Sequence, residues 1–321
     1  MAPPHSTYLK DGIIMTNRES LEKTEGIIFE MQRWSLHDGD GIRSTIFMKG
    51  CPLRCKWCHN PESWRIKPEI LFFKEKCTGC GKCAQICPTG AASQSGDKAS
   101  FERSECIMCL ECLNSCQSKA LKLYGNKITA GELFQKIKRD SVFYRESGGG
   151  VTFSGGEPTM QPKFLDAMVR LCASAGIDTA IETCAYFEWE KLKDTIELID
   201  FVFIDLKHMD NQAHKELTGA PNCGILKNIV RISDMNKKPV IRIPLMAGVN
   251  DGDNLRATLD FISKNVNAAG VELLPYHSFG ESKYPALGLE YSHAFKTPSA
   301  QALQEGRELI KSFGLSVIDY K

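Results

Sequence analysis

The sequence predicts an α/β fold in which parallel strands alternate with helices. Short runs rich in β-branched residues recur through the chain and are separated by amphipathic helical segments, which is typical of parallel βαβ units. Six such units are too few for a closed eight-stranded barrel, so we expect an open, partial (β/α)6 barrel of the TIM-like type. The six strands are expected at residues 44–48, 151–154, 179–182, 201–206, 240–243 and 271–274.

Further elements flank these strands. A β-like run at 27–31 precedes the first of them, and a short one at 316–318 follows the last. Thr129 and Glu132 have the spacing of a capping box, which predicts the start of a helix. Residues 162–175 predict a second helix. The apolar sides of these two helices are expected to comprise Leu133, Phe134, Ile137, Leu165, Met168, Val169 and Cys172.

The overall composition is that of an ordinary globular protein. Hydrophobic residues make up 42% and charged residues 25% of the 321 positions, which excludes disordered, collagen-like and coiled-coil chains. With a net charge of +1, nothing in the overall charge points to nucleic acid or an anionic membrane as a partner, and none is expected. No run reaches the roughly 20 apolar residues needed to cross a bilayer, and residues 1–23 lack the apolar core of a signal peptide. We therefore expect a soluble, cytoplasmic protein with a flexible tail over residues 1–24, in which Met15 is a second candidate start.

The cysteines are distributed very unevenly. Eleven of the 14 cysteines fall between Cys51 and Cys116. A cytoplasmic chain of this length does not need disulfides to build a core, so clustered cysteines there indicate metal ligands.

Eight of these cysteines form two copies of one run. The first copy has the spacing C-x2-C-x2-C-x3-C-P of bacterial ferredoxins, and the second repeats all four cysteines 29 residues later. Zinc is the alternative, but it would usually leave two separate CxxC pairs. The two runs suit two [4Fe–4S] clusters that exchange their fourth ligands. The expected ligand sets are Cys77, Cys80 and Cys83 with Cys116, and Cys106, Cys109 and Cys112 with Cys87.

A segment this small and this rich in cysteine has little apolar core, so bound clusters would organise much of its fold. We therefore expect a discontinuous barrel over residues 25–65 and 125–321, interrupted by a ferredoxin-like insert with two [4Fe–4S] clusters over 66–124.

The remaining three clustered cysteines form a different motif. Cys51, Cys55 and Cys58 are spaced C-x3-C-x2-C and have no fourth cysteine beside them. Three thiolates can hold three irons of a cubane and leave the fourth open, and an open metal position is typical of a catalytic site. The alternative is a fourth protein ligand, either His59 or one of the distant cysteines. Those distant cysteines are Cys172, Cys184 and Cys223, for which we expect ordinary structural roles.

Polar groups follow the expected strands at the point where each strand ends. Reactive groups gather at the carboxyl ends of parallel strands in folds of this kind, so these groups are expected to share one site. In chain order they are the cysteine motif at 51–58, Ser154-Gly155-Gly156-Glu157-Pro158, Glu182-Thr183, Asp205-Leu206-Lys207, Arg242, and Tyr276-His277.

With an aromatic residue at Trp57, the cysteine motif resembles that of the radical S-adenosylmethionine (SAM) superfamily. Five longer motifs extend the comparison: Asp38-Gly39-Asp40-Gly41-Ile42-Arg43, Gly50-Cys51-Pro52-Leu53-Arg54-Cys55-Lys56-Trp57-Cys58-His59-Asn60-Pro61-Glu62, Ser154-Gly155-Gly156-Glu157-Pro158, Phe203-Ile204-Asp205-Leu206-Lys207-His208-Met209 and Leu273-Leu274-Pro275-Tyr276-His277. Through these motifs, residues 25–321 resemble, more narrowly, the glycyl-radical-enzyme activating family. One departure is Asp40, where that family usually has proline.

The resemblance implies an oxidoreductase that activates another enzyme. The open iron would bind SAM, and one electron would split SAM into methionine and a 5′-deoxyadenosyl radical. That radical would take a hydrogen atom from a backbone glycine in the C-terminal loop of a large glycyl radical enzyme.

The resemblance also implies roles for individual residues. Gly155 and Gly156 would let the backbone approach SAM, and Glu157 would accept a hydrogen bond from its ammonium group. The other family positions near SAM are Trp57 beside adenine, Glu182, Thr183 and Asp205 near a monovalent cation, Lys207 and His277 at the carboxylate and ribose, and Arg242.

The eight-cysteine insert resembles that of the branch serving dehydratases, decarboxylases and C–N or C–S lyases, which implies three [4Fe–4S] clusters in all. By resemblance the two extra clusters relay electrons from flavodoxin or ferredoxin, and bracing of the fold is the alternative. A monomer is the simpler expectation.

Two other functions stay open, namely a radical SAM enzyme acting on another peptide or small molecule, and an electron-transfer ferredoxin fused to an inert barrel. Failure of the reduced protein to form 5′-deoxyadenosine from SAM would favour the ferredoxin.

Overall fold

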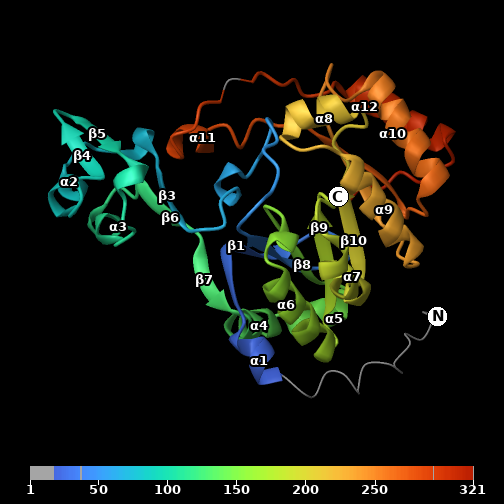
Figure 1. Cartoon of the computed structure of the whole chain (residues 1–321), viewed down its shortest axis with the longest axis horizontal. Helices are drawn as coiled ribbons and strands as arrows, with labels where there is room; N and C mark the ends of the chain where they lie inside the picture. The colour runs from blue at the N-terminus through green and yellow to red at the C-terminus, as the bar shows by residue number, and fades with distance from the viewer. Residues whose placement is uncertain (1–17, 37, 292, 321) are drawn as a thin grey trace.

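The structure is a computed structural model that describes residues 18–36, 38–291 and 293–320. One eight-stranded sheet organises it, in the order β12-β11-β10-β9-β8-β2-β1-β7 among the described residues (Figure 1). From β2 to β12 every neighbouring pair is parallel, whereas β1 pairs antiparallel with β2 and with β7. The strands are β1 (Glu25–Ser35), β2 (Arg43–Met48), β7 (Asn126–Thr129), β8 (Gly150–Gly155), β9 (Asp178–Thr183), β10 (Phe201–Asp205), β11 (Val240–Leu245) and β12 (Gly270–Pro275).

The six predicted parallel strands are confirmed within one or two residues at each end. The run at 27–31 is part of the longer β1. The short strand expected at 316–318 is reduced to a single bridge between Val271 and Val317. The antiparallel strand β7 at the edge of the sheet was not predicted, because its four residues carry too little alternation to stand out.

Helices cover the outer face of this curved sheet (Figure 1). The predicted capping box at Thr129 and Glu132 is present, with both reciprocal hydrogen bonds. In α6 the predicted inward residues are buried, Cys172 among them. The helices of this layer and the neighbouring connections are α1 (Arg18–Lys23), α4 (Ala130–Lys138), α5 (Ser141–Ser147), α6 (Pro162–Ser174), α7 (Trp189–Leu198), α8 (Asn211–Thr218), α9 (Cys223–Asp234), α10 (Gly252–Asn265), α11 (Lys283–Ala286) and α12 (Ala300–Ser312), with 3-10 turns η1 (Pro61–Ser63) and η4 (Pro158–Met160).

The flexible tail predicted for residues 1–24 is wrong at its inner end. Helix α1 is held by ion pairs four residues apart, from Arg18 to Glu22 at 2.8 Å and from Lys23 to Glu19 at 2.5 Å. Leu21 packs against the main core. A helix this short is not evident from periodicity, because it presents only one apolar residue to the core. The rest of the predicted tail, including Met15, lies outside the described residues.

The chain leaves the large sheet after β2 and returns at β7. The residues between them build two small antiparallel sheets, β3 with β6 and β4 with β5. This segment lies to one side of the barrel in Figure 1. Its elements are β3 (Glu69–Phe72), η2 (Lys74–Lys76), α2 (Lys82–Ile86), β4 (Ala92–Ser95), β5 (Lys98–Phe101), η3 (Arg103–Glu105), α3 (Glu111–Ser115) and β6 (Leu121–Tyr124).

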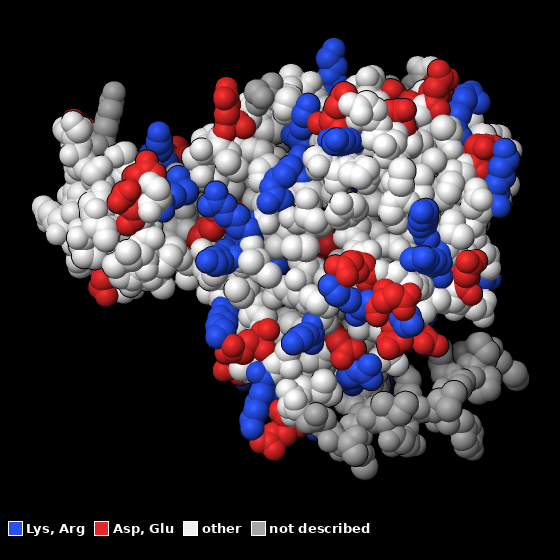
Figure 2. Space-filling model, in the orientation of Figure 1, with Lys and Arg blue, Asp and Glu red and all other residues white. Residues whose placement is uncertain are grey.

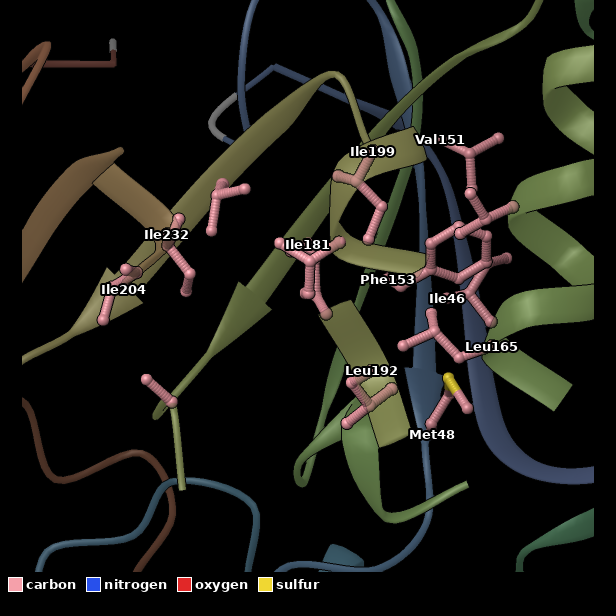
Figure 3. Packing of buried hydrophobic residues seen from close by; sticks show 14 of the residues in the cluster. Ile46, Met48, Val151, Phe153, Leu165, Ile181, Leu192, Ile199, Ile204 and Ile232 are labelled. Atoms are coloured by element: carbon pink, nitrogen blue, oxygen red, sulfur yellow. The ribbon is translucent and has the colours of Figure 1, made fainter. Parts of the chain in front are cut away.

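Side-chain alternation separates an apolar outer face of the sheet from a polar inner one. Phe153 of β8 points outward into the main core beneath α6, where Figure 3 shows it beside Ile46 and Leu165. Its neighbours Thr152 and Ser154 are buried on the opposite side. On the surface, positive and negative side chains are interspersed over the face drawn in Figure 2, and none of the described helices is long and apolar enough to span a bilayer.

The main core predicts the response to truncation of Phe153. The side chain is 0% exposed, so Phe153→Ala should lower the free energy of unfolding by about 3–5 kcal/mol through the cavity it leaves. Anaerobic urea unfolding measures this change. Phe279→Ala, at a ring that is 75% exposed, is the control and should change stability little; equal losses for the two variants would contradict the assignment of this core.

Candidate active site

A cavity of about 250 Å³ lies at the carboxyl ends of the parallel strands. It brings together most of the predicted site residues, which come from the loop after β2 and from the ends of β8, β9, β10 and β12. Glu157 and Arg242 are the two predicted residues that lie behind its wall. The predicted residues in the lining are Cys51, Cys55, Trp57, Cys58, Ser154, Gly155, Gly156, Glu182, Thr183, Asp205, Lys207, Tyr276 and His277.

The loop after β2 carries the three-cysteine motif, and it is pinned by backbone hydrogen bonds. The amides of Arg54 and Lys56 donate to the end of α8, at 2.7 Å and 3.0 Å. Cys51, Cys55 and Cys58 belong to one apolar cluster, which also contains Cys184. Burial raises the pKa of all three thiols, that of Cys58 to about 12. Such thiols become thiolates when a metal replaces their protons, and three of them at one wall suit an iron–sulfur cluster with an open position.

The turn after β8 approaches this loop as closely as a backbone can. Gly155 has φ +112°, and a Cβ on it would lie 2.4 Å from the Met48 amide nitrogen. A Cβ on Gly156 would lie 2.3 Å from the Gly50 carbonyl oxygen. The amide of Gly156 donates to the Met48 carbonyl at 2.9 Å, which ties the two strand ends together. Only glycine fits at either position.

Glu157 is fully buried and its carboxylate is engaged within the protein. One oxygen accepts hydrogen bonds from the hydroxyls of Thr159 at 2.7 Å and Thr183 at 2.9 Å, and the other accepts one from the Cys184 amide at 2.7 Å. This carboxylate therefore joins the ends of β8 and β9. Its contact with a SAM ammonium group stays a prediction.

A network of buried charges fills the inner face of the sheet below the cavity. Arg242 of β11 donates to Glu272 of β12 at 2.8 Å and also binds Glu182 of β9. Its guanidinium lies 4.6 Å from the centre of the Phe203 ring. Burial opposes the charge on Arg242, but the two glutamates raise its pKa. Burial is likewise the main cause that raises the pKa of Glu182, which also accepts a hydrogen bond from Ser154.

A second pair of charges lies at the cavity wall after β10. Lys207 Nζ lies 3.2 Å from Asp205 Oδ2. Burial opposes the charge on Lys207, yet Asp205 and the nearby Cys55 raise its pKa. The Asn250 side chain donates to the Lys207 carbonyl at 3.1 Å and fixes the loop. An ammonium group held beside the cysteine loop can bind a carboxylate.

Two histidines stand at the edge of the cavity. The ring of His59 meets that of His277 edge-on, with centroids 4.6 Å apart. Burial, with smaller contributions from Lys283 and His277, lowers the pKa of His59 to about 4. His59 is therefore neutral at neutral pH and can accept or donate a hydrogen bond.

The eight cysteines of the side segment gather in two groups around α2 and α3. A small cavity of about 20 Å³ is lined by four cysteines, two of which come from α2 or its approach and one from the end of α3. Cys112 has Cys106, Cys109 and Cys87 as near neighbours, and Cys83 of the first group also lies within electrostatic reach. The four cysteines of the first group are Cys77, Cys80, Cys83 and Cys116.

None of the described residues forms a group of three or more His, Cys, Asp or Glu side chains close enough to hold a single metal ion. The grouped thiols remain a donor set of the soft kind that iron–sulfur clusters use.

Several residues at the site were missed by sequence reasoning. Glu272 could have been found, since a charged residue in the middle of a buried strand needs a buried partner. Cys184 is a distant candidate for the fourth ligand for which the sequence predicts an ordinary structural role, but it lines the cavity in one cluster with the three motif cysteines. Lys283 and Tyr284 hold the cysteine loop from more than 220 residues away, and no local pattern signals such a contact.

Comparison with known proteins agrees with this geometry. The profile of the Radical SAM superfamily matches residues 107–262, and that of the 4Fe-4S binding domain matches residues 70–93. The chain is 46% identical over 286 residues to the 4-hydroxyphenylacetate decarboxylase activating enzyme of Clostridioides difficile, which covers 86% of this chain and 90% of that protein. It is 40% identical over 274 residues to the (2S)-3-sulfopropanediol dehydratase activating enzyme of Klebsiella oxytoca, covering 83% and 86%.

Among solved structures, a domain of pyruvate-formate lyase-activating enzyme from Bacteroides vulgatus matches with a TM-score of 0.46 and 32% identity, over 53% of this chain and 98% of that one.

The partial barrel, together with the Radical SAM superfamily match over residues 107–262, defines a radical SAM protein; the match does not extend to the cysteine loop at 51–58. Sequence identities of 37–46% to activating enzymes, over most of both chains, place the chain in one family within this superfamily. The chain belongs to the family of glycyl-radical-enzyme activating enzymes.

The glycine turn predicts a steric defect that a control can isolate. Gly155→Ala would drive a Cβ against the β2 backbone, which cannot move aside, so we expect a large loss of stability and of SAM binding. Gly176→Ala is the control, because Gly176 also has a positive φ of +64° but no atom within 4 Å of the added Cβ; that change should cost only about 1–2 kcal/mol. Thermal unfolding and calorimetric SAM binding under anaerobic conditions measure both, and equal effects would contradict the close approach.

Proposed function

We propose that this chain activates a glycyl radical enzyme by removing a hydrogen atom from one backbone glycine of that partner. The observation that carries the proposal is the meeting of the three motif cysteines with the Gly155–Gly156 turn and the Asp205–Lys207 pair at a single cavity. Bound there, a [4Fe–4S] cluster and SAM would supply the electron and the radical for this reaction. The chain's own residues bind, orient and exclude water.

The residues divide between ligation and orientation. Cys51, Cys55 and Cys58 would hold the cluster and leave one iron for SAM. Lys207 would bind the SAM carboxylate, and the bare backbone of Gly155 and Gly156 leaves room for its methionine part. Trp57 and His277 line the same cavity and would contact adenine and ribose.

Buried charges would support the SAM site from behind. Arg242 and Glu157 lie behind the cavity wall. They would contact SAM directly only if part of SAM reached beyond the residues that line the cavity. Through Glu182, Thr183 and Cys184 they fix the end of β9. Glu182, Thr183 and Asp205 are the residues that we propose for a monovalent cation, although Arg242 already neutralises Glu182 and Lys207 already pairs with Asp205.

The side segment would hold two further [4Fe–4S] clusters, giving three in all. The lining of the small cavity by Cys77, Cys80, Cys83 and Cys116 supports the first exchanged ligand set. The neighbours of Cys112 support the second, with Cys106, Cys109 and Cys87. Electron relay from flavodoxin or ferredoxin is the role we infer for them.

The partner is inferred from the activating enzymes to which the chain is similar. Their names include a decarboxylase, a dehydratase and lyases that release trimethylamine or sulfite. We infer a large glycyl radical enzyme of this kind as partner, a monomeric activase that binds it transiently, and a cytoplasmic location, where thiols stay reduced.

Loss of one clustered cysteine tests the central proposal. Cys55→Ala should abolish formation of 5′-deoxyadenosine from SAM by the reduced, anaerobic protein, while iron analysis still finds two of three clusters. Cys223→Ala is the control, because this exposed cysteine lies away from the cavity, and it should leave both readouts unchanged. Continued SAM cleavage by Cys55→Ala would refute the site assignment.

The insert is tested by a double variant, Cys80→Ala with Cys109→Ala. Cys80 and Cys109 belong to different proposed clusters, so the two substitutions together remove one ligand from each insert cluster. Electron delivery from reduced flavodoxin should therefore slow while SAM binding is spared. Stopped-flow reduction and calorimetry measure the two. Unchanged turnover with the protein donor would support a bracing role for the insert instead.

A further inference from the structure

A short segment near the C-terminus, residues 280–289, touches both the cysteine-rich insert and the three-cysteine loop; it is called the bridge segment below. It contains α11, and Figure 1 shows α11 between the insert and the barrel. Nothing in its composition marks it, and it lies outside the set of residues that line the cavity. Its contacts run in both directions.

On the barrel side, Lys283 binds the residues that follow Cys58. Its ammonium group donates to the His59 carbonyl at 3.0 Å, the Asn60 side chain at 2.9 Å and the Glu62 carboxylate at 2.6 Å. Glu62 is only 1% exposed and the Lys283 side chain is 20% exposed, so the carboxylate is buried and the ammonium group is partly so. The Lys283 ammonium group thus donates hydrogen bonds to three acceptors in the segment that follows Cys58.

Tyr284 adds a contact to the cysteine itself. Its hydroxyl donates to the Cys58 carbonyl at 3.0 Å, and its ring meets that of Trp64 edge-on at 5.7 Å. Gly280 lies so close to this loop that a Cβ would come within 2.8 Å of the His59 backbone. The bridge segment therefore clamps the Cys58 end of the loop.

On the other side, the bridge segment is fastened to the insert. The Arg103 guanidinium donates to the Ala286 carbonyl. Leu71 and Phe73, in and after β3, share one apolar cluster with Ala286 and Leu287. A polar contact and an apolar one thus join the same helical turn to the insert.

A second link runs beside the first. Lys49, at the end of β2, is 0% exposed and donates to the Glu62 carbonyl at 2.6 Å and to the Glu69 carboxylate at 3.0 Å. Glu69 is the first residue of β3, so this lysine connects the root of the insert to the cysteine loop. Both links meet at Glu62.

We propose that the bridge segment positions the insert against the Cys58 end of the three-cysteine loop and so sets the spacing between the two cysteine systems. The inference rests on the proposed function, because the spacing matters only if both systems hold clusters. Arg103 and Lys283 are positioning residues, acting from the insert side and the barrel side. Loosening either contact should loosen the other through the four residues of α11.

The test uses the full-length, cluster-loaded protein and substitutes the insert side alone. Arg103→Met should raise hydrogen–deuterium exchange not only in the insert but also at residues 58–64, across the bridge. It should also slow SAM cleavage driven by reduced flavodoxin severalfold, while cleavage driven by dithionite, a small reductant, stays within twofold. Lys264→Met is the matched control, since this exposed lysine pairs only within α10, and it should change neither.

The outcomes separate this proposal from the proposed function. If the unsubstituted protein with dithionite fails to cleave SAM, the proposed function fails. If it cleaves SAM, but Arg103→Met leaves both the exchange at 58–64 and the flavodoxin-to-dithionite ratio unchanged, the bridge is refuted. Should Arg103→Met lose iron or unfold, Tyr284→Phe is the second variant, because it removes only the hydroxyl on the Cys58 carbonyl. It should raise exchange at 58–64 and lower the same ratio, and no change in either would again refute the bridge.

Discussion

The contact between the end of β2 and the glycine turn after β8 is the constraint on which the site depends. Parallel pairing places Met48 opposite Gly155, and the absence of side chains at Gly155 and Gly156 lets the two backbones meet. The amide of Glu157 then donates to the Gly50 carbonyl at 2.8 Å, beside the first cysteine. A side chain at either glycine would push the cysteine loop away from the strand ends that carry Glu182, Asp205 and Lys207.

Below that contact, side chains alternate along each strand between the two faces of the sheet, so that one face is apolar and the other is polar and charged. Ile181 of β9 and Ile241 of β11 point outward and pack under the helices. The next residue on each strand, Glu182 and Arg242, points inward. A buried arginine shared by two glutamates is costly to assemble and more costly to break. It gives the cavity a fixed polar floor that would not rearrange when an anionic or cationic ligand enters.

The sequence was sufficient for the parallel strands and for most of the strand-end residues that the structure places around the cavity, because both depend on short-range patterns. β-branched runs mark the strands, and the polar group after each run marks its carboxyl end. It was insufficient where a contact joins distant segments. Lys283 and Tyr284 lie in a segment without periodicity, and helix α1 depends on packing of Leu21 rather than on propensity. Glu157 is the instructive case, since its position in the motif was evident but its burial beneath Cys184 follows only from how β8 and β9 pair.

The antiparallel pairing of β3 with β6 has a consequence for how the chain is assembled. Glu69 lies opposite Tyr124, so the polypeptide departs and comes back at nearly one point, and the residues between them do not act as an open loop. Loop closure entropy grows only slowly with length in any case. For folding of the barrel, the insert is therefore equivalent to a short hairpin. A module of this size can be present or absent between β2 and β8 without altering the register of either strand.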